Sequence, residues 1–308
     1  ANTGMTGAPV RSASTPSAAP LRGRAEGALQ AEVWRLKQSW AIIPFEAINP
    51  RWKVLRVDGA SPLDKGFDAG KYPLVVNFGL EGEAGALAQV LRLAPELLPR
   101  TNRDPNRLSV VVMTGVTALV RGTAWMMERM GMTFPGKTVR DWLVEADITH
   151  ISNEVAFNPK CPAPDPQDPD LRFCSDPKYI QLLDYVGADV IELTGNHLND
   201  FGTDAVLYSI DLYKQRNWLY FGGGENSRKA NQTATLTDHG NKIAFIGCNA
   251  AGPPSVWATS SKPGAAKCDM AEVVLEIKRL KSQGYLVIST FQSFESYDAT
   301  PLPIHYKD

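Results

Sequence analysis

The 308-residue sequence lacks several features that would assign it to a class at once. It has no apolar run of the roughly 18–20 residues that a membrane span needs. It has no basic excess, because 32 Lys and Arg residues balance 33 Asp and Glu residues to a net charge of −1, which argues against a nucleic-acid partner. With 44% apolar and 21% charged residues, it is neither a disordered chain nor a coiled coil.

Cysteine and histidine are scarce, at four residues each. No CxxC pair occurs and no histidine has zinc-finger spacing, so a structural zinc site is not expected. Cys161 and Cys174 flank a Pro- and Asp-rich loop, and Cys248 and Cys268 flank a Gly- and Pro-rich loop. Two disulfides that each close one loop would imply an oxidising, extracytoplasmic location. The alternative is four free thiols in a cytosolic protein, and other pairings stay open.

Composition divides the chain into three parts. Residues 1–27 are rich in Ala, Ser, Thr, Pro and Gly, which is typical of a flexible linker or tail. Residues 28–105 hold helical patterns and short β-like runs, and we expect a small α/β segment there. Within residues 106–308 apolar runs alternate with helical patterns, which predicts an α/β domain with a layered, partly parallel sheet. The chain starts without Met and stops just after an expected strand, so we expect a mature form or a truncated piece.

Polar residues that could carry chemistry follow four of the expected strands, where ligands of such folds bind. The segments are Gly115-Val116-Thr117, Ser152-Asn153-Glu154, Gly195-Asn196-His197 and Gln292-Ser293-Phe294-Glu295. Asn, Glu and His suit divalent cations and could also serve as acid and base in hydrolysis.

Each of these residues also has an ordinary explanation. Asn196 and His197 could form a turn and a helix cap. Glu154 could be a surface acid, and Glu295 could pair with a lysine. We expect His150, inside a strand, to be a packed core residue and His239, in an Asp-His-Gly turn, to be solvated.

Four segments carry a family resemblance: Ala146–Glu154 (ADITHISNE), Asp189–Gly202 (DVIELTGNHLNDFG), Gly222–Asn226 (GGGEN) and Lys242–Gly247 (KIAFIG). In this order they resemble the CapA family of capsule and poly-γ-glutamate synthesis proteins, which are related to calcineurin-like metallophosphoesterases. The resemblance covers about residues 108–297. It implies a four-layered α/β/β/α sandwich with a metal site on the strand-end loops. More faintly, Trp40–Phe45, Pro50–Val54 and Tyr72–Leu74 resemble the end of a periplasmic solute-binding-type domain.

The resemblance implies roles for particular side chains. The catalytic residues would be His197 as acid, base or ligand, Asn196 orienting phosphate or metal, and Glu154 as ligand or base. A divalent metal (Mn, Mg or Zn) would be held by Asn153, Glu154 and His197. Substrate contacts would come from Arg121, Asp200, Gln292 and Glu295.

Two positions depart from the family pattern. The family's GDimlgR motif is GVTALVR here, so Val116 stands where an Asp ligand is expected. Its HwG.Ey motif is QSFESY here, so Gln292 replaces a His, and a later motif with paired His has no counterpart. A two-metal site needs ligands around two ions ~3.5–4 Å apart, and these losses leave too few.

Two interpretations therefore stay open. The first is an extracytoplasmic protein with an altered phosphoesterase-type site that acts in capsule or polyglutamate-type polymer synthesis or attachment. Its partners would be a cell-surface polymer or the membrane-bound machinery that makes it. The second is a non-catalytic surface binding or structural module that kept the fold and holds no metal.

Overall fold

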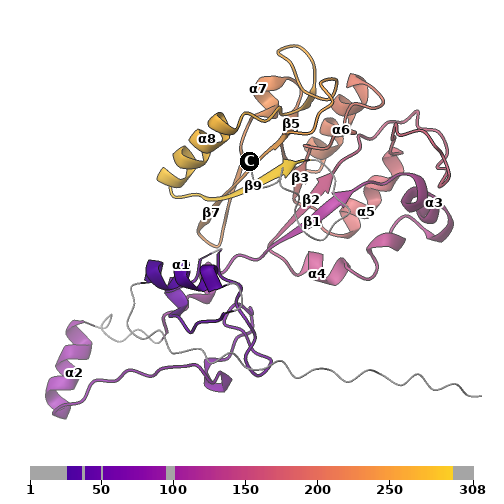
Figure 1. The fold of residues 1–308 in the computed structure, drawn as a ribbon. Coiled ribbons are helices and arrows are strands. Elements are labelled where there is room, and N and C mark those ends of the chain that lie inside the picture. The colour runs from indigo at the N-terminus through magenta and orange to yellow at the C-terminus, as the bar shows by residue number, and fades with distance from the viewer. Residues whose placement is uncertain (1–25, 37–38, 50, 95–100, 294–308) are drawn as a thin grey trace, which may run out of the picture. The chain divides into compact units, whose positions relative to one another are not determined.

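The computed structural model describes residues 26–36, 39–49, 51–94 and 101–293 (Figure 1). The chain divides into two compact units, Ala1–Pro105 and Asn106–Asp308. Within the described ranges no helix combines the length and the apolar character that crossing a membrane requires.

Polar contacts dominate the first unit. Its regular elements are α1 (Glu26–Leu36), η1 (Phe45–Ala47), η2 (Ala69–Lys71) and α2 (Ala84–Leu93). Among its described residues, Ala47 is the one apolar side chain that is buried. The buried Arg103 guanidinium donates to the backbone carbonyls of Pro62 and Asp64, at 2.7 Å in each case. Such a unit depends on hydrogen bonds more than on an apolar core.

The β-like runs expected in residues 28–105 do not become strands. In the described part of this unit, extended backbone pairs as an isolated bridge between Val57 and Ala60. The expectation was wrong because alternation favours a strand only where a second strand accepts its backbone hydrogen bonds. The resemblance of this region to a solute-binding-type domain stays a prediction.

Four parallel strands form the first sheet of the second unit. They are, in spatial order, β1 (Val111–Thr117), β2 (Ile148–Asn153), β3 (Val190–Glu192) and β4 (Leu219–Phe221). Parallel strands need crossover connections, and helices supply them. The helical elements before and between these strands are η4 (Pro105–Arg107), α3 (Arg121–Met130), η5 (Phe134–Gly136), α4 (Arg140–Val144), η6 (Pro177–Tyr179), α5 (Ile180–Tyr185) and α6 (Thr203–Gln215).

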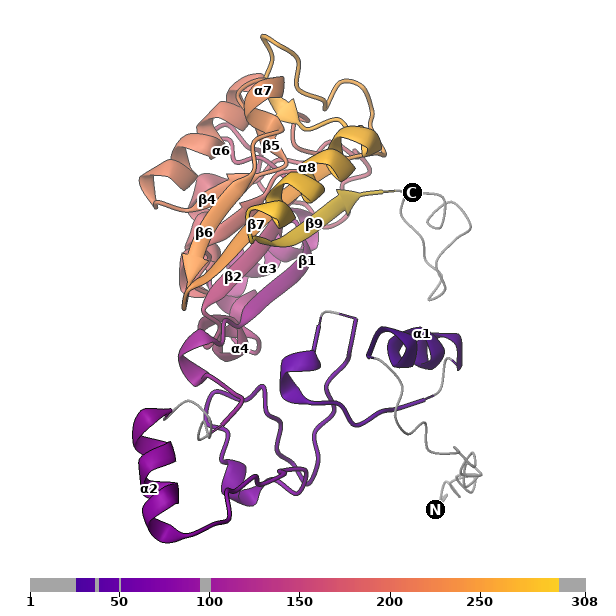
Figure 2. The ribbon, with the colours of Figure 1, turned by 90° about the vertical axis from the view of Figure 1, so that its left-hand side faces the viewer.

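A second sheet follows, with strand order β6 (Ala234–Asp238), β7 (Asn241–Asn249) and β9 (Leu286–Gln292). β6 and β7 form an antiparallel hairpin, and β7 and β9 are parallel. Helix α8 (Met270–Ser282) connects β7 to β9 and covers the outer face, where Leu280 packs with Ala244 and Ile246 (Figure 2). The remaining short elements are β5 (Gly223–Gly224), its partner β8 (Gly264–Ala265), and α7 (Ser227–Ala230).

The two sheets pack face to face, and helices cover both outer faces. Between the sheets lies a buried apolar cluster made of Ile148, Val190, Phe221, Ala234, Ile243 and Phe245. On the other face of the first sheet, Ile151 and Ile191 share a core with Leu183 of α5 and Val206 of α6. Helix, sheet, sheet and helix are therefore the four layers. The predicted α/β class and layered α/β/β/α sandwich are confirmed.

Two disulfides close loops within this unit. One joins Cys161 to Cys174 in the connection between β2 and η6, and the other joins Cys248 of β7 to Cys268 just before α8. The loop-local pairing favoured by the sequence is confirmed.

Candidate functional site

The carboxyl ends of β2, β3 and β9 bring together three of the expected site residues. Glu154 follows β2 directly, Asn196 lies in the loop after β3, and Gln292 is the last residue of β9. The Gln292 Nε2 group donates to Asn196 Oδ1 at 2.9 Å and lies 3.4 Å from Glu154 Oε1. We call Glu154, Asn196 and Gln292 the strand-end group. Its members are far apart in sequence and meet only because β9 lies parallel to β7 in the second sheet.

Gly195 allows the loop after β3 to approach Glu154 closely. A Cβ atom at this position would lie 2.6 Å from both the Cα and the Cγ of Glu154. Since the Cα is backbone, such a contact could be relieved only by moving one of the two loops. A glycine immediately before Asn196 is therefore part of how the strand-end group forms.

His197 belongs to a second group, one residue beyond Asn196. Its Nδ1 lies 2.7 Å from Asp200 Oδ2, and the same oxygen accepts the backbone N–H of Phe173 at 2.8 Å. The Phe173 ring packs on the imidazole with a centroid separation of 4.3 Å. Because a carboxylate can only accept, Nδ1 carries a proton in this arrangement. Asp200 thus holds the ring orientation, as in His–carboxylate pairs generally.

Arg121 reaches this second group through the disulfide loop. It is the first residue of α3, and its guanidinium lies over the Phe173 ring, 5.7 Å from the centroid. The same guanidinium donates to the backbone carbonyl of Asp168, inside the loop that Cys161 and Cys174 close. Loops that follow three neighbouring strands thus bring Arg121, Phe173, His197 and Asp200 together.

Other predicted residues lie apart from these groups. The Asn153 amide donates to Tyr213 Oη at 2.8 Å and to the Val155 carbonyl at 3.0 Å. Tyr213 lies on α6, so Asn153 faces the helical layer and not Glu154. Val116 lies in β1 at a break in register and is 59% exposed. Glu295 lies outside the described residues.

The described residues do not fit a two-metal centre at the strand ends. At the end of β9 the nitrogen of an amide faces the oxygens of Glu154 and Asn196, and nitrogen of this kind is a donor and not a ligand. At the end of β1, Val116 has no donor atom. Glu154, His197 and Asp200 remain as ionisable ligands, and one oxygen of Asp200 already contacts His197 and Phe173, so fewer ligands remain than two bridged ions require. The arrangement can bind hydroxyl, carbonyl or anionic oxygens through Gln292, His197 and Arg121.

His150 and Glu192 form a buried pair between the sheets just below this edge, and this pair was not predicted from the sequence. His150 Nε2 lies 3.1 Å from Glu192 Oε2, with side chains only 1% and 7% exposed. The Thr194 hydroxyl donates to Glu192 Oε1 at 2.5 Å. Burial alone would raise the pKa of Glu192, but hydrogen bonds and charge interaction with His150 and Thr194 outweigh it and hold that pKa below its usual value.

The expected packing of His150 in the core is confirmed, since its ring lies between the sheets near Phe221 and Phe245. A signal for Glu192 was present in the sequence. It is a lone acid in the run Val190-Ile191-Glu192-Leu193, and a buried carboxylate needs a partner.

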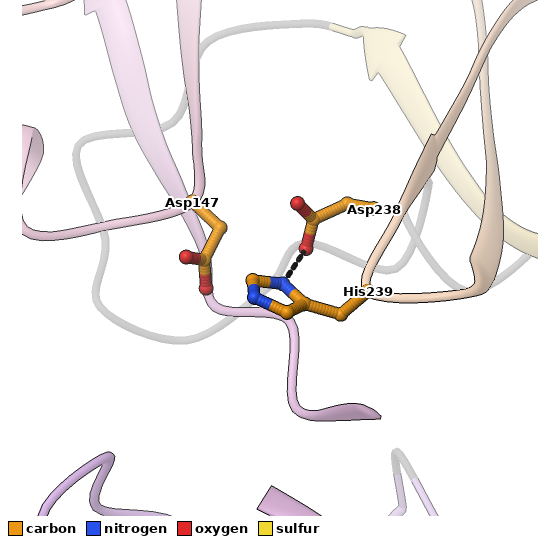
Figure 3. A group of neighbouring side chains, drawn as sticks. All are labelled: Asp147, Asp238 and His239. Atoms are coloured by element: carbon orange, nitrogen blue, oxygen red, sulfur yellow. Dashed lines mark hydrogen bonds and ion pairs between the residues drawn. The ribbon is translucent and has the colours of Figure 1, made fainter. Parts of the chain in front are cut away.

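Another group of ionisable residues lies at the opposite edge of the sheets (Figure 3). Asp147 precedes β2, Asp238 ends β6, and His239 occupies the β6–β7 turn. One ligand atom from each lies within 4.8 Å of the others, and His239 Nδ1 is 2.7 Å from Asp238 Oδ2. His239 is an exposed turn residue, as the sequence predicted, and its imidazole also pairs with Asp238. This group is separate from the strand-end group, because it lies at the amino end of β2.

We call the strand-end group and the second group around His197 together the strand-end site. The fold and this site define a layered α/β protein consistent with the metallophosphoesterase-like class, with polar groups gathered at the carboxyl ends of its strands. Comparison with known proteins then identifies the family. A model described as "Bacterial capsule synthesis protein PGA_cap" matches residues 110–306, and the chain belongs to this family. The predicted resemblance is thereby confirmed.

A curated relative, "Capsule biosynthesis protein CapA" of Bacillus anthracis, is 21% identical over 211 residues. The match covers 67% of this chain and 51% of the relative, so the chain spans about half the length of that protein. Family membership points to a role in capsule biosynthesis.

Proposed function

We propose that this protein acts outside the cytoplasm in the synthesis or attachment of a capsule or polyglutamate-type polymer, and that its strand-end site binds the polymer. The observation that carries this proposal is the Gln292 amide bridging Asn196 and Glu154. These hydrogen bonds connect all three side chains of the strand-end group. They support a site that is altered from the phosphoesterase type and serves recognition.

The chemistry of the site favours a ligand rich in carbonyl or carboxylate oxygens. The guanidinium of Arg121 is a fixed positive charge that suits carboxylate groups. The amides of Asn196 and Gln292 offer both donors and acceptors, which suits a polymer with amide linkages. Partners of this kind would be the surface polymer itself and the membrane-bound machinery that makes it.

The extracytoplasmic placement rests on the two disulfides. Both cross-links are local, and such bonds persist in oxidising compartments and are rare in the cytosol. Mass spectrometry of the protein under non-reducing conditions, taken from its native host, would count free thiols. Two intact bonds support this placement, and four free thiols contradict it.

The binding proposal is tested by titrating the protein with a γ-linked glutamate oligomer in a calorimeter. We expect Gln292→Ala to weaken binding about tenfold, because a half-buried, hydrogen-bonded amide bridge is lost. The matched control is Gln283→Ala, an exposed amide just before β9 begins, at the opposite end of that strand, and it should leave binding unchanged. Equal affinity of both variants and the wild type would refute the proposal.

A second candidate function is hydrolysis, which the pairing of His197 with Asp200 favours. A carboxylate on Nδ1 is the arrangement that lets the opposite ring nitrogen exchange a proton with a substrate. Turnover of a phosphoester or of the oligomer that is lost in His197→Ala, with the melting temperature unchanged, would establish this function. No turnover in the wild type, together with binding of the oligomer, supports the recognition function.

A further inference from the structure

The loop closed by the Cys161–Cys174 disulfide contributes one side chain that contacts two separate parts of the site. Phe173 immediately precedes Cys174. Its ring lies 4.3 Å from the imidazole of His197 and 5.7 Å from the guanidinium carbon of Arg121, measured to the ring centroid. Its backbone N–H donates to Asp200 Oδ2, the same oxygen that contacts His197.

The loop also anchors Arg121 directly. The guanidinium donates to the Asp168 carbonyl near the middle of the loop. Between Cys161 and Cys174 the described backbone has no helix or strand, and the side-chain carboxylates of Asp165, Asp168 and Asp170 make only local turn hydrogen bonds. A loop of this kind has little structure of its own, so the cross-link limits the positions that Asp168 and Phe173 can take.

We infer that Phe173 is a positioning residue of the strand-end site and that the Cys161–Cys174 disulfide keeps the loop in the form that holds Arg121 and His197. This inference rests on the proposed function for its consequence in binding, but the positioning itself is independent of any ligand. Phe173 fixes the orientation of the His197 imidazole by ring contact and by its hydrogen bond to Asp200. The Asp168 carbonyl and the Phe173 ring together fix the position of the Arg121 guanidinium.

A direct test uses NMR of the protein labelled at histidine. The chain has four histidines, and the Cε1–H signal of His197 is assigned by its loss in His197→Gln. An aromatic ring packed on the imidazole displaces this signal through its ring current. We expect Phe173→Leu to abolish the displacement and Phe173→Tyr to keep it. Phe134→Leu is the matched control. Phe134 lies in η5, is half-buried, and its ring also lies beneath a cation, that of Lys137.

The second disulfide supplies a control for the first. We expect the double change Cys161→Ser with Cys174→Ser to move the His197 signal toward its Phe173→Leu position. The double change Cys248→Ser with Cys268→Ser removes a cross-link of 20-residue separation, against 13 for the first, and should not do so. A His197 signal that is unaltered by Phe173→Leu, or moved equally by both double changes, overturns the inference. Thermal melts first confirm folding, and the Phe173 variants decide the question if a cysteine variant fails to fold.

Binding of the γ-linked glutamate oligomer separates this inference from the proposed function. We expect Phe173→Leu to weaken binding about tenfold, with Phe173→Tyr restoring most of the affinity. If the wild type binds no oligomer while the NMR result holds, the proposed ligand is wrong and the positioning role stands. If the oligomer binds equally to the wild type and Phe173→Leu, the positioning role in binding is refuted and the proposed function stands.

Discussion

The buried His150–Glu192 pair joins the neighbouring strands β2 and β3 of the first sheet, and it offers the sharpest test of how the interior of this domain is stabilised. Both side chains are almost fully buried between β2 and β3 on one side and the second sheet on the other, at a separation of 3.1 Å. Removing one partner of a buried pair leaves an uncompensated polar group, which costs about 3–5 kcal/mol. We expect Glu192→Gln to lower the free energy of unfolding by about 3 kcal/mol or less, because the amide of Gln can still accept a hydrogen bond from Thr194.

For a domain of this size, about 3 kcal/mol corresponds to a fall in melting temperature of roughly 6–12 °C. Differential scanning calorimetry at neutral pH measures it. The matched control is Glu272→Gln, an exposed acid in the first turn of α8, for which we expect less than about 0.5 kcal/mol. If Glu192→Gln and the control Glu272→Gln have the same melting temperature, the carboxylate of Glu192 is not stabilised by its surroundings.

The pH dependence of this difference has a definite sign. The pKa of Glu192 is lowered in the folded protein, so its carboxylate stabilises the fold fully at pH values above its unfolded pKa of about 4.3. That contribution disappears as the pH falls through the lowered folded pKa. The stability gap between the wild type and Glu192→Gln should therefore be constant at neutral pH and shrink at acid pH. A gap that widens on acidification would contradict the lowered pKa.

Three further predictions follow from contacts at the site and can be measured by urea unfolding or elemental analysis. Gly195→Ala should destabilise the protein by about 1–3 kcal/mol, because its Cβ would meet the backbone of Glu154; a neutral result would contradict the close approach. Tyr213→Phe should cost about 1–2 kcal/mol, since the Asn153 amide loses an acceptor; a smaller effect than at an exposed tyrosine would refute this. After dialysis against Mn, Mg and Zn, we expect no pair of stoichiometric ions, and chelator should leave the melting temperature unchanged; two bound ions would refute the altered site.

The candidate site shows where reasoning from residues succeeds and where it stops. Glu154, Asn196 and Gln292 follow expected strands, and a parallel arrangement brings strand ends to one edge, so their meeting could be anticipated. The orientation of Asn153 could not be anticipated. Adjacent residues at the end of a strand face opposite layers, and only the packing of Tyr213 on α6 decides which layer Asn153 faces. Phe173 was missed because a residue in a Pro- and Asp-rich loop has no periodicity that indicates its contacts.

The sequence by itself determined the α/β class and favoured the local disulfide pairs, and its family resemblance placed Val116 and Gln292 where metal ligands are expected. These are properties of local pattern, short loops and residue chemistry, which need no knowledge of distant segments. Only the tertiary structure decided that Gln292 donates to Asn196, that Glu192 pairs with His150, and that Phe173 packs on His197. Each of these contacts joins segments whose separation depends on how sheets and loops pack, and the free energy of that packing is shared across the whole domain.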